Sequence, residues 1–167
     1  MATKVAFRPY KREWFYLIDH KGMLFLEETD PKNYTSCLKD QPFLDFFFDN
    51  LQSNQTGNNP QCSFISPCWG EMNFVKCHRY PIVFRHLDAQ GMMPFAGTKL
   101  EAFNPVKLAR DEEGFLFHEV TVNEKLKTYG GFDTDLAMQL AEQISVDADD
   151  KFLIEWKGRI FPIDKLI

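Results

Sequence analysis

Three short phrases along the chain share one pattern of polar and apolar positions: an acid, two residues, a glycine and then an apolar pair that ends in phenylalanine. The phrases are Asp19–Phe25, Asp111–Phe117 and Glu155–Phe161. Glycine readily adopts the positive φ that closes a three-residue hairpin loop, and the acid can accept hydrogen bonds from the turn. A phosphate-binding loop would need more glycines and would open onto a helix. We therefore predict three β-hairpin turns, in which the acid of each phrase is the hydrogen-bond acceptor.

The segment "KDQPFLDFFFDNLQ" has apolar residues at the period of an α-helix. Its apolar stripe consists of Leu44, Phe47, Phe48 and Leu51. Asp40 suits the N-cap, and Pro42 suits the first turn, where a missing amide proton costs little. We predict a helix that begins at Asp40, buries this stripe and turns Asp45 and Asp49 to water.

A second helical stripe lies in the last third of the chain. It consists of Leu136, Leu140 and Ile144. Asp133 or Thr134 can cap this helix at its start, and the pattern predicts that it runs to about Val146.

Most of the remaining segments read as short strands that are rich in aromatic and branched residues. The predicted strands are Trp14–Ile18, Met23–Glu28, Ser63–Ile65, Glu71–Cys77, Ile82–Leu87, Met93–Ala96, Leu100–Phe103 and Phe115–Val122. Antiparallel pairing is the simplest arrangement for such short strands. The polar segment 53–61 predicts an exposed, mobile loop, and Asn104 with Pro105 predicts a turn.

These elements predict an α+β fold, with antiparallel sheets built from hairpins and two amphipathic helices. The 167 residues suit a single domain, 1–167. The order of hairpins, helices and strands also suggests a weak internal duplication, with halves at about 12–90 and 91–167.

Composition excludes several classes of protein. The chain is 44% hydrophobic and has 17 phenylalanines, which is typical of a folded protein with an aromatic core. Its apolar runs are much shorter than the roughly 20 residues that span a bilayer, so no membrane span is predicted. The net charge is -5 and no basic stripe is present, so no nucleic acid partner is predicted.

The stretch "SPCWGEMNFVKCH" contains the strongest candidates for catalysis. A cysteine nucleophile needs a nearby base that ionises its thiol. The histidine could be His78, His86 or His118, because the sequence does not fix their distances from Cys68, and His86 is our candidate. Cys68 with Glu71 and this histidine would make a small cysteine-dependent enzyme. The simpler interpretation is that Cys68 packs as a small apolar group in a β core.

A zinc site is the second chemistry that this stretch suggests. Its ligands would be Cys62, Cys68, Cys77 and His78. Structural zinc ligands usually come in pairs two to four residues apart, whereas these cysteines are more widely spaced. Adjacent residues of a strand also point to opposite faces. We therefore predict no metal site and no cofactor.

Three basic residues are candidates for holding an anionic ligand. Arg79 and Arg85 flank the strand after Pro81, and Lys39 precedes the predicted helix start, where an anion is favoured. The alternative for each is a solvated surface charge.

Several phrases together resemble a small eukaryotic family of uncharacterised proteins. They are "FYLIDHKGMLFLEE", "CLKDQPFLDFFFDNL", "SPCWGEMNFVKC" and "PIVFRHL", with "FNPVKL", "GFLFHEV" and "EWKGRIF" further on. The order of elements is also similar, more loosely, to a bacterial family of unknown function. Cys37, Cys68 and Cys77 match the eukaryotic pattern, whereas Cys62 and His78 depart from it.

This resemblance implies a mitochondrial location, because animal members of the family are identified as mitochondrial; otherwise we expect a cytoplasmic protein. The basic start of the chain, with Lys4, Arg8, Lys11 and Arg12, fits a shortened presequence or a plain basic tail. Four cysteines without a secretory signal also indicate a reducing compartment. The family has no established activity, so the resemblance implies no catalytic residue.

The leading functional hypothesis is a non-catalytic module or assembly factor that binds a protein or a small ligand. The alternative is the small enzyme centred on Cys68. A third hypothesis, a subunit of a larger organellar assembly, predicts a large exposed apolar patch.

Overall fold

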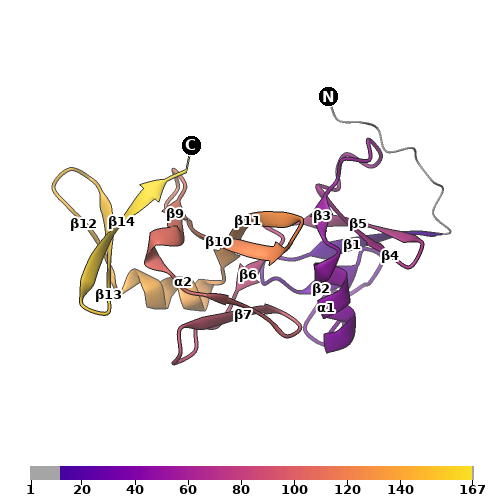
Figure 1. Ribbon diagram of the computed structural model, residues 1–167, viewed down its shortest axis with the longest axis horizontal. Helices are drawn as coiled ribbons and strands as arrows, with labels where there is room; N and C mark the ends of the chain where they lie inside the picture. Colours follow the sequence, from indigo (N-terminus) through magenta and orange to yellow (C-terminus); the bar gives the residue numbers. More distant parts are fainter. Residues whose placement is uncertain (1–11, 167) are drawn as a thin grey trace.

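The computed structural model describes residues 12–166, and the basic residues Lys4, Arg8 and Lys11 lie outside them. The prediction of an α+β fold built from hairpins with two helices is confirmed. The molecule is elongated, and its two ends are formed by different halves of the chain (Figure 1). Neither helix in the described part is long and apolar enough to cross a lipid bilayer.

The first sheet has five strands and lies at one end of the molecule (Figure 1). In spatial order they are β2 (Leu24–Leu26), β1 (Arg12–Ile18), β5 (Glu71–Cys77), β4 (Phe64–Cys68) and β3 (Gln52–Ser53). The β1–β2 and β4–β5 hairpins join through a parallel pairing of β1 with β5. The sequence predicts only antiparallel pairs, because the pairing of segments far apart in the chain leaves no local signal.

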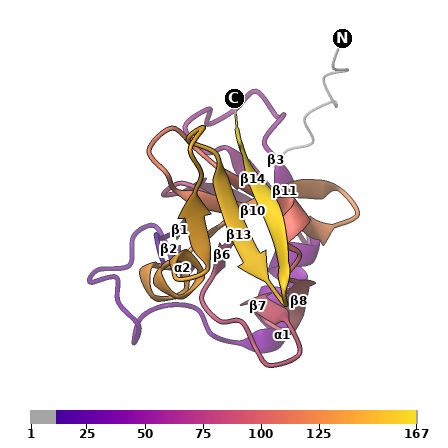
Figure 2. The same ribbon diagram turned by 90° about the vertical axis from the view of Figure 1, so that its left-hand side faces the viewer.

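The second sheet has seven strands and extends to the opposite end, where β12, β13 and β14 face the viewer in Figure 2. In spatial order they are β12 (Ile144–Val146), β13 (Phe152–Trp156), β14 (Arg159–Lys165), β9 (Leu108–Arg110), β10 (Leu116–Asn123), β11 (Leu126–Phe132) and β6 (Val83–Phe84). Parallel pairs join β14 to β9 and β11 to β6. Strand β6 is shorter than the predicted 82–87, and the residues that follow it are free to line a cleft.

Helix α1 (Gln41–Asp49) begins as predicted. The Asp40 carboxylate accepts a hydrogen bond from the backbone N–H of Phe43 at 3.0 Å, and Pro42 lies in the first turn. Phe47 and Phe48 are buried, as the apolar stripe predicts.

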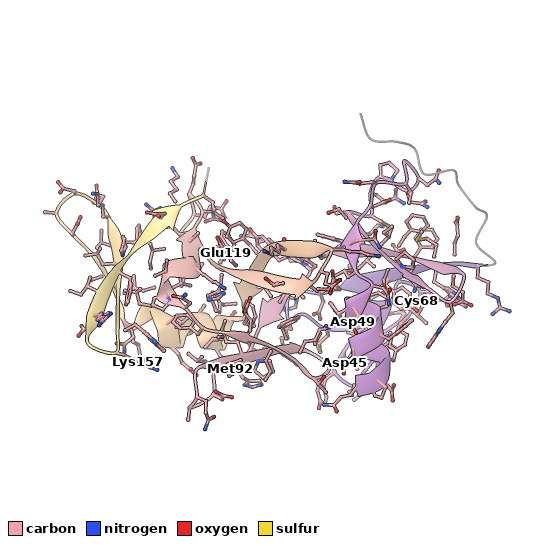
Figure 3. The ribbon with its side chains drawn as sticks, viewed as in Figure 1. Asp45, Asp49, Cys68, Met92, Glu119 and Lys157 are labelled. Carbon is pink, nitrogen blue, oxygen red and sulfur yellow. The ribbon has the colours of Figure 1, made fainter. Side chains whose placement is uncertain are left out.

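Asp49 of α1 is exposed and Asp45 is partly exposed, in keeping with the prediction that both acids face water. The two acids also make contacts that the helical pattern does not predict. They contact an antiparallel ribbon formed by β7 (Met92–Ala96) and β8 (Lys99–Ala102). Asp45 accepts hydrogen bonds at 2.8 Å from both the N–H and the hydroxyl of Thr98, which lower the pKa of Asp45. Asp49 forms an ion pair with Lys99. Figure 3 shows Asp45 and Asp49 on the same helix. The helical period indicates that these acids lie opposite the core stripe, but it cannot show that another element contacts them.

Helix α2 (Thr134–Ala141) is shorter than predicted. Asp133 caps it through a 2.9 Å hydrogen bond from the N–H of Leu136. The predicted extension to Val146 is wrong, because Ile144 enters β12 and pairs with Ile154 of β13. Pairing with the edge of β13 provides backbone hydrogen bonds in place of those that another helical turn would form.

The hairpin prediction is confirmed for all three phrases, with one correction. Gly22 and Gly114 have φ values of 81° and 90° and close turns as expected. The third turn has only two residues, Lys157 and Gly158, both with positive φ, between the paired Trp156 and Arg159. Glu155 therefore lies within β13, and its predicted role as a turn acceptor is wrong.

Two further turns use the same chemistry without the full sequence phrase. Asp88 accepts hydrogen bonds from the N–H groups of Gln90 and Met92, ahead of the positive φ of Gly91. Asp147 does the same between β12 and β13, but there the residue with positive φ is Asp150, at 59°. An L-residue is strained in this conformation, although aspartate tolerates it better than most.

Replacement of Asp150 by glycine is therefore expected to stabilise the protein. Glycine removes the strain of the left-handed conformation, and it also stabilises the unfolded chain by increasing its conformational entropy. Because the first effect is the larger, the free energy of unfolding should rise by about 0.5 kcal/mol. Urea denaturation measures the change. Asp149→Gly is the matched control, because Asp149 has no positive φ. A gain no larger for Asp150→Gly than for Asp149→Gly would contradict the strain.

The polar loop 53–61 is exposed at most of its positions, as predicted. Asn54 closes it: the side-chain amide donates to the carbonyl oxygens of Asn58 and Cys62, and its oxygen accepts from Thr56. The polar side chain of Asn54 thus anchors a loop that has no apolar residue to anchor it. Its mobility stays a prediction.

One buried cluster connects the two sheets. It includes Phe47 of α1, Val75 of β5, Phe84 of β6 and Ile154 of β13. Residues from both predicted halves share this core, and β6, from the first half, pairs in the second sheet. The single domain and the internal duplication stay predictions.

A candidate anion-binding cleft

Two adjoining cavities lie where the chain leaves β6. The first, which we call the basic pocket, has a volume of about 290 Å³ and includes Lys21, Lys39, Arg85 and His86 in its lining. The second, which we call the aromatic pocket, has a volume of about 620 Å³ and includes Tyr80, Phe115, Phe132 and three histidines. Both are lined by Lys21, Val83, Arg85 and His86, so together they form one cleft. Their volumes match those of small-molecule sites.

A close backbone contact brings the cationic residues of the cleft together. The β1–β2 turn packs on β6 so tightly that a Cβ atom at Gly22 would lie 3.0 Å from the Cβ of Val83. Lys21 in the turn and Arg85 just after β6 therefore line the same cavity. Lys39 reaches it from the residue before the N-cap of α1.

The basic pocket carries positive charge without local compensation. Its lining, in the described part of the chain, contains Lys21, Lys39 and Arg85 but no carboxylate. Arg85 is exposed, and among residues 12–166 it forms no ion pair. Lys39 lies 4.9 Å from the ring centroid of Tyr34, a cation–π distance. The N–H groups at the start of α1 contribute less, because Asp40 already caps that helix.

The aromatic pocket has mixed charge and several planar side chains. Arg79 lies over the ring of Phe115 at 4.2 Å and pairs with Asp111 at 3.5 Å. The rings of His20 and His78 approach edge to face, with centroids 6.0 Å apart. Desolvation by burial raises the pKa of Tyr80, which packs on Phe117.

The three residues predicted to bind an anion all line this cleft. Lys39 lines the basic pocket, Arg79 lines the aromatic pocket, and Arg85 lines both. His86, predicted as a catalytic partner of Cys68, lines both pockets beside Arg85 instead.

Cys68 lies elsewhere, in β4 on the face of the first sheet that α1 covers, and it lines neither pocket of the cleft (Figure 3). The segment "SPC" belongs to the strand, and the turn follows at Trp69 and Gly70. Burial raises the pKa of the Cys68 thiol, and its polar neighbours are Ser66, Asn73 and Glu71. Glu71 accepts a hydrogen bond from the indole of Trp14 at 3.0 Å. No histidine is among the groups that shift the Cys68 pKa, so the geometry favours packing over catalysis.

Slow alkylation of Cys68 in the folded protein is the expected result. A buried, protonated thiol should react with iodoacetamide at least about tenfold more slowly than the partly exposed Cys37. Timed labelling at pH 7.5, followed by peptide mass spectrometry, gives both rates in one sample. The difference should vanish in urea. A Cys68 that reacts faster than Cys37 in folded protein would support the cysteine enzyme instead.

The residues of the zinc hypothesis are dispersed. Cys62 packs with Ile65 and Met72 on one face of the first sheet, whereas Cys77 packs against the main core on the other. Burial raises the pKa of Cys77 to about 11, which disfavours the thiolate that zinc requires. Among residues 12–166, no three potential ligands lie close enough together to hold a metal.

His118 is buried and has a structural role. Its Nε2 accepts a hydrogen bond from the N–H of Asn104 at 3.0 Å, so Nδ1 carries the proton and donates to the carbonyl oxygen of Glu119 at 2.6 Å. Desolvation by burial lowers the pKa of His118, which keeps the ring neutral. The ring thereby fixes the start of the 3-10 helix η1 (Pro105–Lys107), where the predicted turn lies.

Sequence reasoning missed three residues of the cleft: Lys21, Tyr80 and Phe115. Lys21 and Phe115 fall in or beside segments that were interpreted as hairpin turns only. The one local signal in the sequence is a phenylalanine directly after a turn glycine, and the structure shows that 51% of the surface of Phe115 is exposed.

Comparison with known proteins gives a family and a fold. A family model described as "Domain of unknown function (DUF4505)" matches residues 5–167. The crystal structure of a DUF1285 family protein from Silicibacter pomeroyi is similar, with a TM-score of 0.52 and 15% identity, over 94% of this chain and 83% of that one. A DUF1285 family protein from Shewanella baltica has a TM-score of 0.51 and 11% identity, over 77% of this chain and 91% of that one. At such identities the likeness concerns the fold alone, and it confirms the resemblance to a bacterial family of unknown function.

Proposed function

The chain belongs to the DUF4505 family, whose function is unknown, and from the chemistry of the cleft we propose that it is a non-catalytic protein that binds a small anionic ligand. One observation carries this proposal. In a protein of net charge -5, the basic pocket has three cationic side chains in its lining and no carboxylate among the described residues. Such a pocket concentrates positive potential, because the low-dielectric walls of a cleft focus the field.

Arg85 is the expected anchor of the ligand. It lies where the two pockets join, and it forms no ion pair with a carboxylate of the described residues. A guanidinium can bind a carboxylate or a phosphate through two parallel hydrogen bonds. Lys21 and Lys39 add charge from two other elements, so the ligand would contact segments that are distant in sequence.

The charge reversal Arg85→Glu is expected to weaken binding of inorganic pyrophosphate, our probe, by about 10- to 100-fold. The loss corresponds to about 1.4–3 kcal/mol, the range for a charge-assisted contact in a partly exposed site. Isothermal titration calorimetry at low salt measures the affinity, which should also fall as salt is raised.

The matched control is Arg159→Glu, which makes the same charge change at an exposed position of the β13–β14 hairpin and outside the cleft. Equal losses for the two variants would indicate a general effect of net charge and contradict the site. Unchanged affinity in Arg85→Glu would contradict it as well.

A protein partner is the other form of the binding hypothesis. The four most exposed large apolar side chains, those of Trp69, Val106, Tyr34 and Ile160, lie in four separate segments of the described chain. This dispersion favours a small ligand over a broad apolar interface.

The proposal includes a mitochondrial location. It rests on the resemblance to mitochondrial eukaryotic proteins and on the basic start of the chain. Fractionation of cells that express the full chain tests it, and a purely cytoplasmic distribution would contradict it.

A further inference from the structure

We infer that the ligand of the cleft is a ring-bearing anion: its charged group binds at Arg85 and the basic pocket, and a planar ring occupies the aromatic pocket. This inference rests on the proposed function and specifies the class of ligand. The two pockets share Arg85 and His86, so one molecule of modest length can occupy both. A volume of about 620 Å³ exceeds what a phosphate or a carboxylate alone would fill.

The aromatic pocket presents planar surfaces that suit a ring. Phe115 keeps 51% of its surface exposed although it lies in a concave site. The guanidinium of Arg79 covers part of this ring at 4.2 Å, and Asp111 holds that guanidinium in place. Aromatic rings and stacked guanidinium planes are the surfaces on which ligand rings and nucleobases stack.

Polar groups around the same pocket suit the edge of a heteroaromatic ring. His20 and His78 present imidazole nitrogens that can donate or accept. Thr134 and Asp135 are exposed at the first turn of α2, and their hydroxyl and carboxylate groups can accept hydrogen bonds from the N–H groups of a ring. The carboxylates of this pocket also make a second anionic group there unfavourable, which directs the charged end of the ligand to the basic pocket.

The charge distribution thus gives the ligand a direction. The basic pocket has cations and no described carboxylate, whereas in the aromatic pocket Asp19, Asp133 and Asp135 offset the charges of its three cationic residues. Asp19 and Asp133 are occupied by hydrogen bonds from the β1–β2 turn and from the start of α2. Asp135 has no such bond among the described residues, so both of its carboxylate oxygens are available to a ligand.

Three phosphate compounds test the inference by titration calorimetry with the full chain. Ribose 5-phosphate has the anion without an aromatic ring, AMP adds a heteroaromatic ring, and 1-naphthyl phosphate adds a purely apolar one. Stacking on an aromatic surface is expected to make AMP bind about tenfold more tightly than ribose 5-phosphate. An equal gain in affinity for 1-naphthyl phosphate and AMP, relative to ribose 5-phosphate, would support the ring pocket. It would also show that the pocket does not select a nucleobase over an apolar ring.

Phe115→Ala is expected to lower the affinity for AMP about tenfold and to change the affinity for ribose 5-phosphate less than twofold. The ribose 5-phosphate measurement also verifies that the variant is folded. Trp69→Ala, which removes an exposed aromatic outside the cleft, should leave both affinities unchanged.

The two proposals fail in different ways. If all three phosphates bind equally and Arg85→Glu weakens them all, the ring pocket is overturned and the anion site stands. If Phe115→Ala weakens ribose 5-phosphate as much as AMP, the ring pocket is likewise overturned. If none of the three binds, and pyrophosphate does not bind, both proposals are overturned.

Discussion

Replacement of Phe84 by alanine is expected to lower the free energy of unfolding by about 3–5 kcal/mol, a large part of the roughly 5–15 kcal/mol that stabilises a typical domain. Phe84 is completely buried, and its ring lies 5.7 Å from that of Phe132 and 5.9 Å from that of His118. Its strand, β6, has only two residues, so packing of this side chain rather than strand pairing holds the segment in place. Urea denaturation followed by tryptophan fluorescence measures the loss.

Ile160→Ala is the control for Phe84→Ala, because Ile160 is 68% exposed on β14 and its truncation should change stability by less than about 0.5 kcal/mol. A loss below about 1 kcal/mol for Phe84→Ala would contradict its central position in the core. Because Arg85 and His86 directly follow Phe84 in the chain, Phe84→Ala should also weaken binding of pyrophosphate at the cleft. A loss of stability without any loss of pyrophosphate binding would show that packing of Phe84 does not position the binding residues.

Gly130→Ala is expected to destabilise the protein by about 1–3 kcal/mol through overpacking. A Cβ atom at Gly130 would lie 2.5 Å from Cε2 of Phe84 and 3.1 Å from Cγ2 of Ile82, and both neighbours are buried. These side chains cannot move aside, because the core around them is closely packed. Urea denaturation again gives the change in unfolding free energy.

The neighbouring glycine of β11 supplies the matched control. A Cβ atom at Gly131 would meet only Cδ2 of Tyr80, at 3.3 Å, so Gly131→Ala should cost much less than Gly130→Ala. The double variant Gly130→Ala/Phe84→Leu tests the cause, because a smaller side chain at position 84 leaves room for the new methyl group. Its loss should be smaller than the sum of the two single losses. Strict additivity would show that the two positions do not clash.

The fold explains why the cleft is independent of Cys68. The cleft forms where the β1–β2 turn meets β6, close to the junction of the two sheets, and Gly22 permits that approach. Cys68 lies beneath α1, in the first sheet, and Figure 3 places it at the end of the molecule opposite Lys157. Variants of the cleft and of Cys68 can therefore be interpreted separately.

Helix starts and hairpin turns could be predicted from the sequence because their causes are local. The side chains of Asp40 and Asp133 satisfy backbone N–H groups three residues away, and Gly22 and Gly114 adopt a positive φ that other residues resist. The types of the candidate binding residues were also evident, since Lys39, Arg79 and Arg85 have the chemistry that an anion requires.

The end of α2 and the use of the acids on α1 could not be predicted, because the competing partners are distant in sequence. Ile144 leaves the helical pattern to pair with Ile154, and Asp45 accepts hydrogen bonds from Thr98. A periodic pattern shows which side of a helix is polar, but it carries no information on what covers that side.

The sequence alone therefore determined the local geometry of turns and helix starts, the α+β class and the residue types that can bind an anion. Only the tertiary structure decided the three parallel strand pairs, the separation of Cys68 from His86, and the meeting of Lys21, Lys39 and Arg85 in one cleft. The physical reason is the range of the interactions involved. Backbone strain and capping act within a few residues, whereas strand pairing and core packing join segments whose proximity no local pattern encodes.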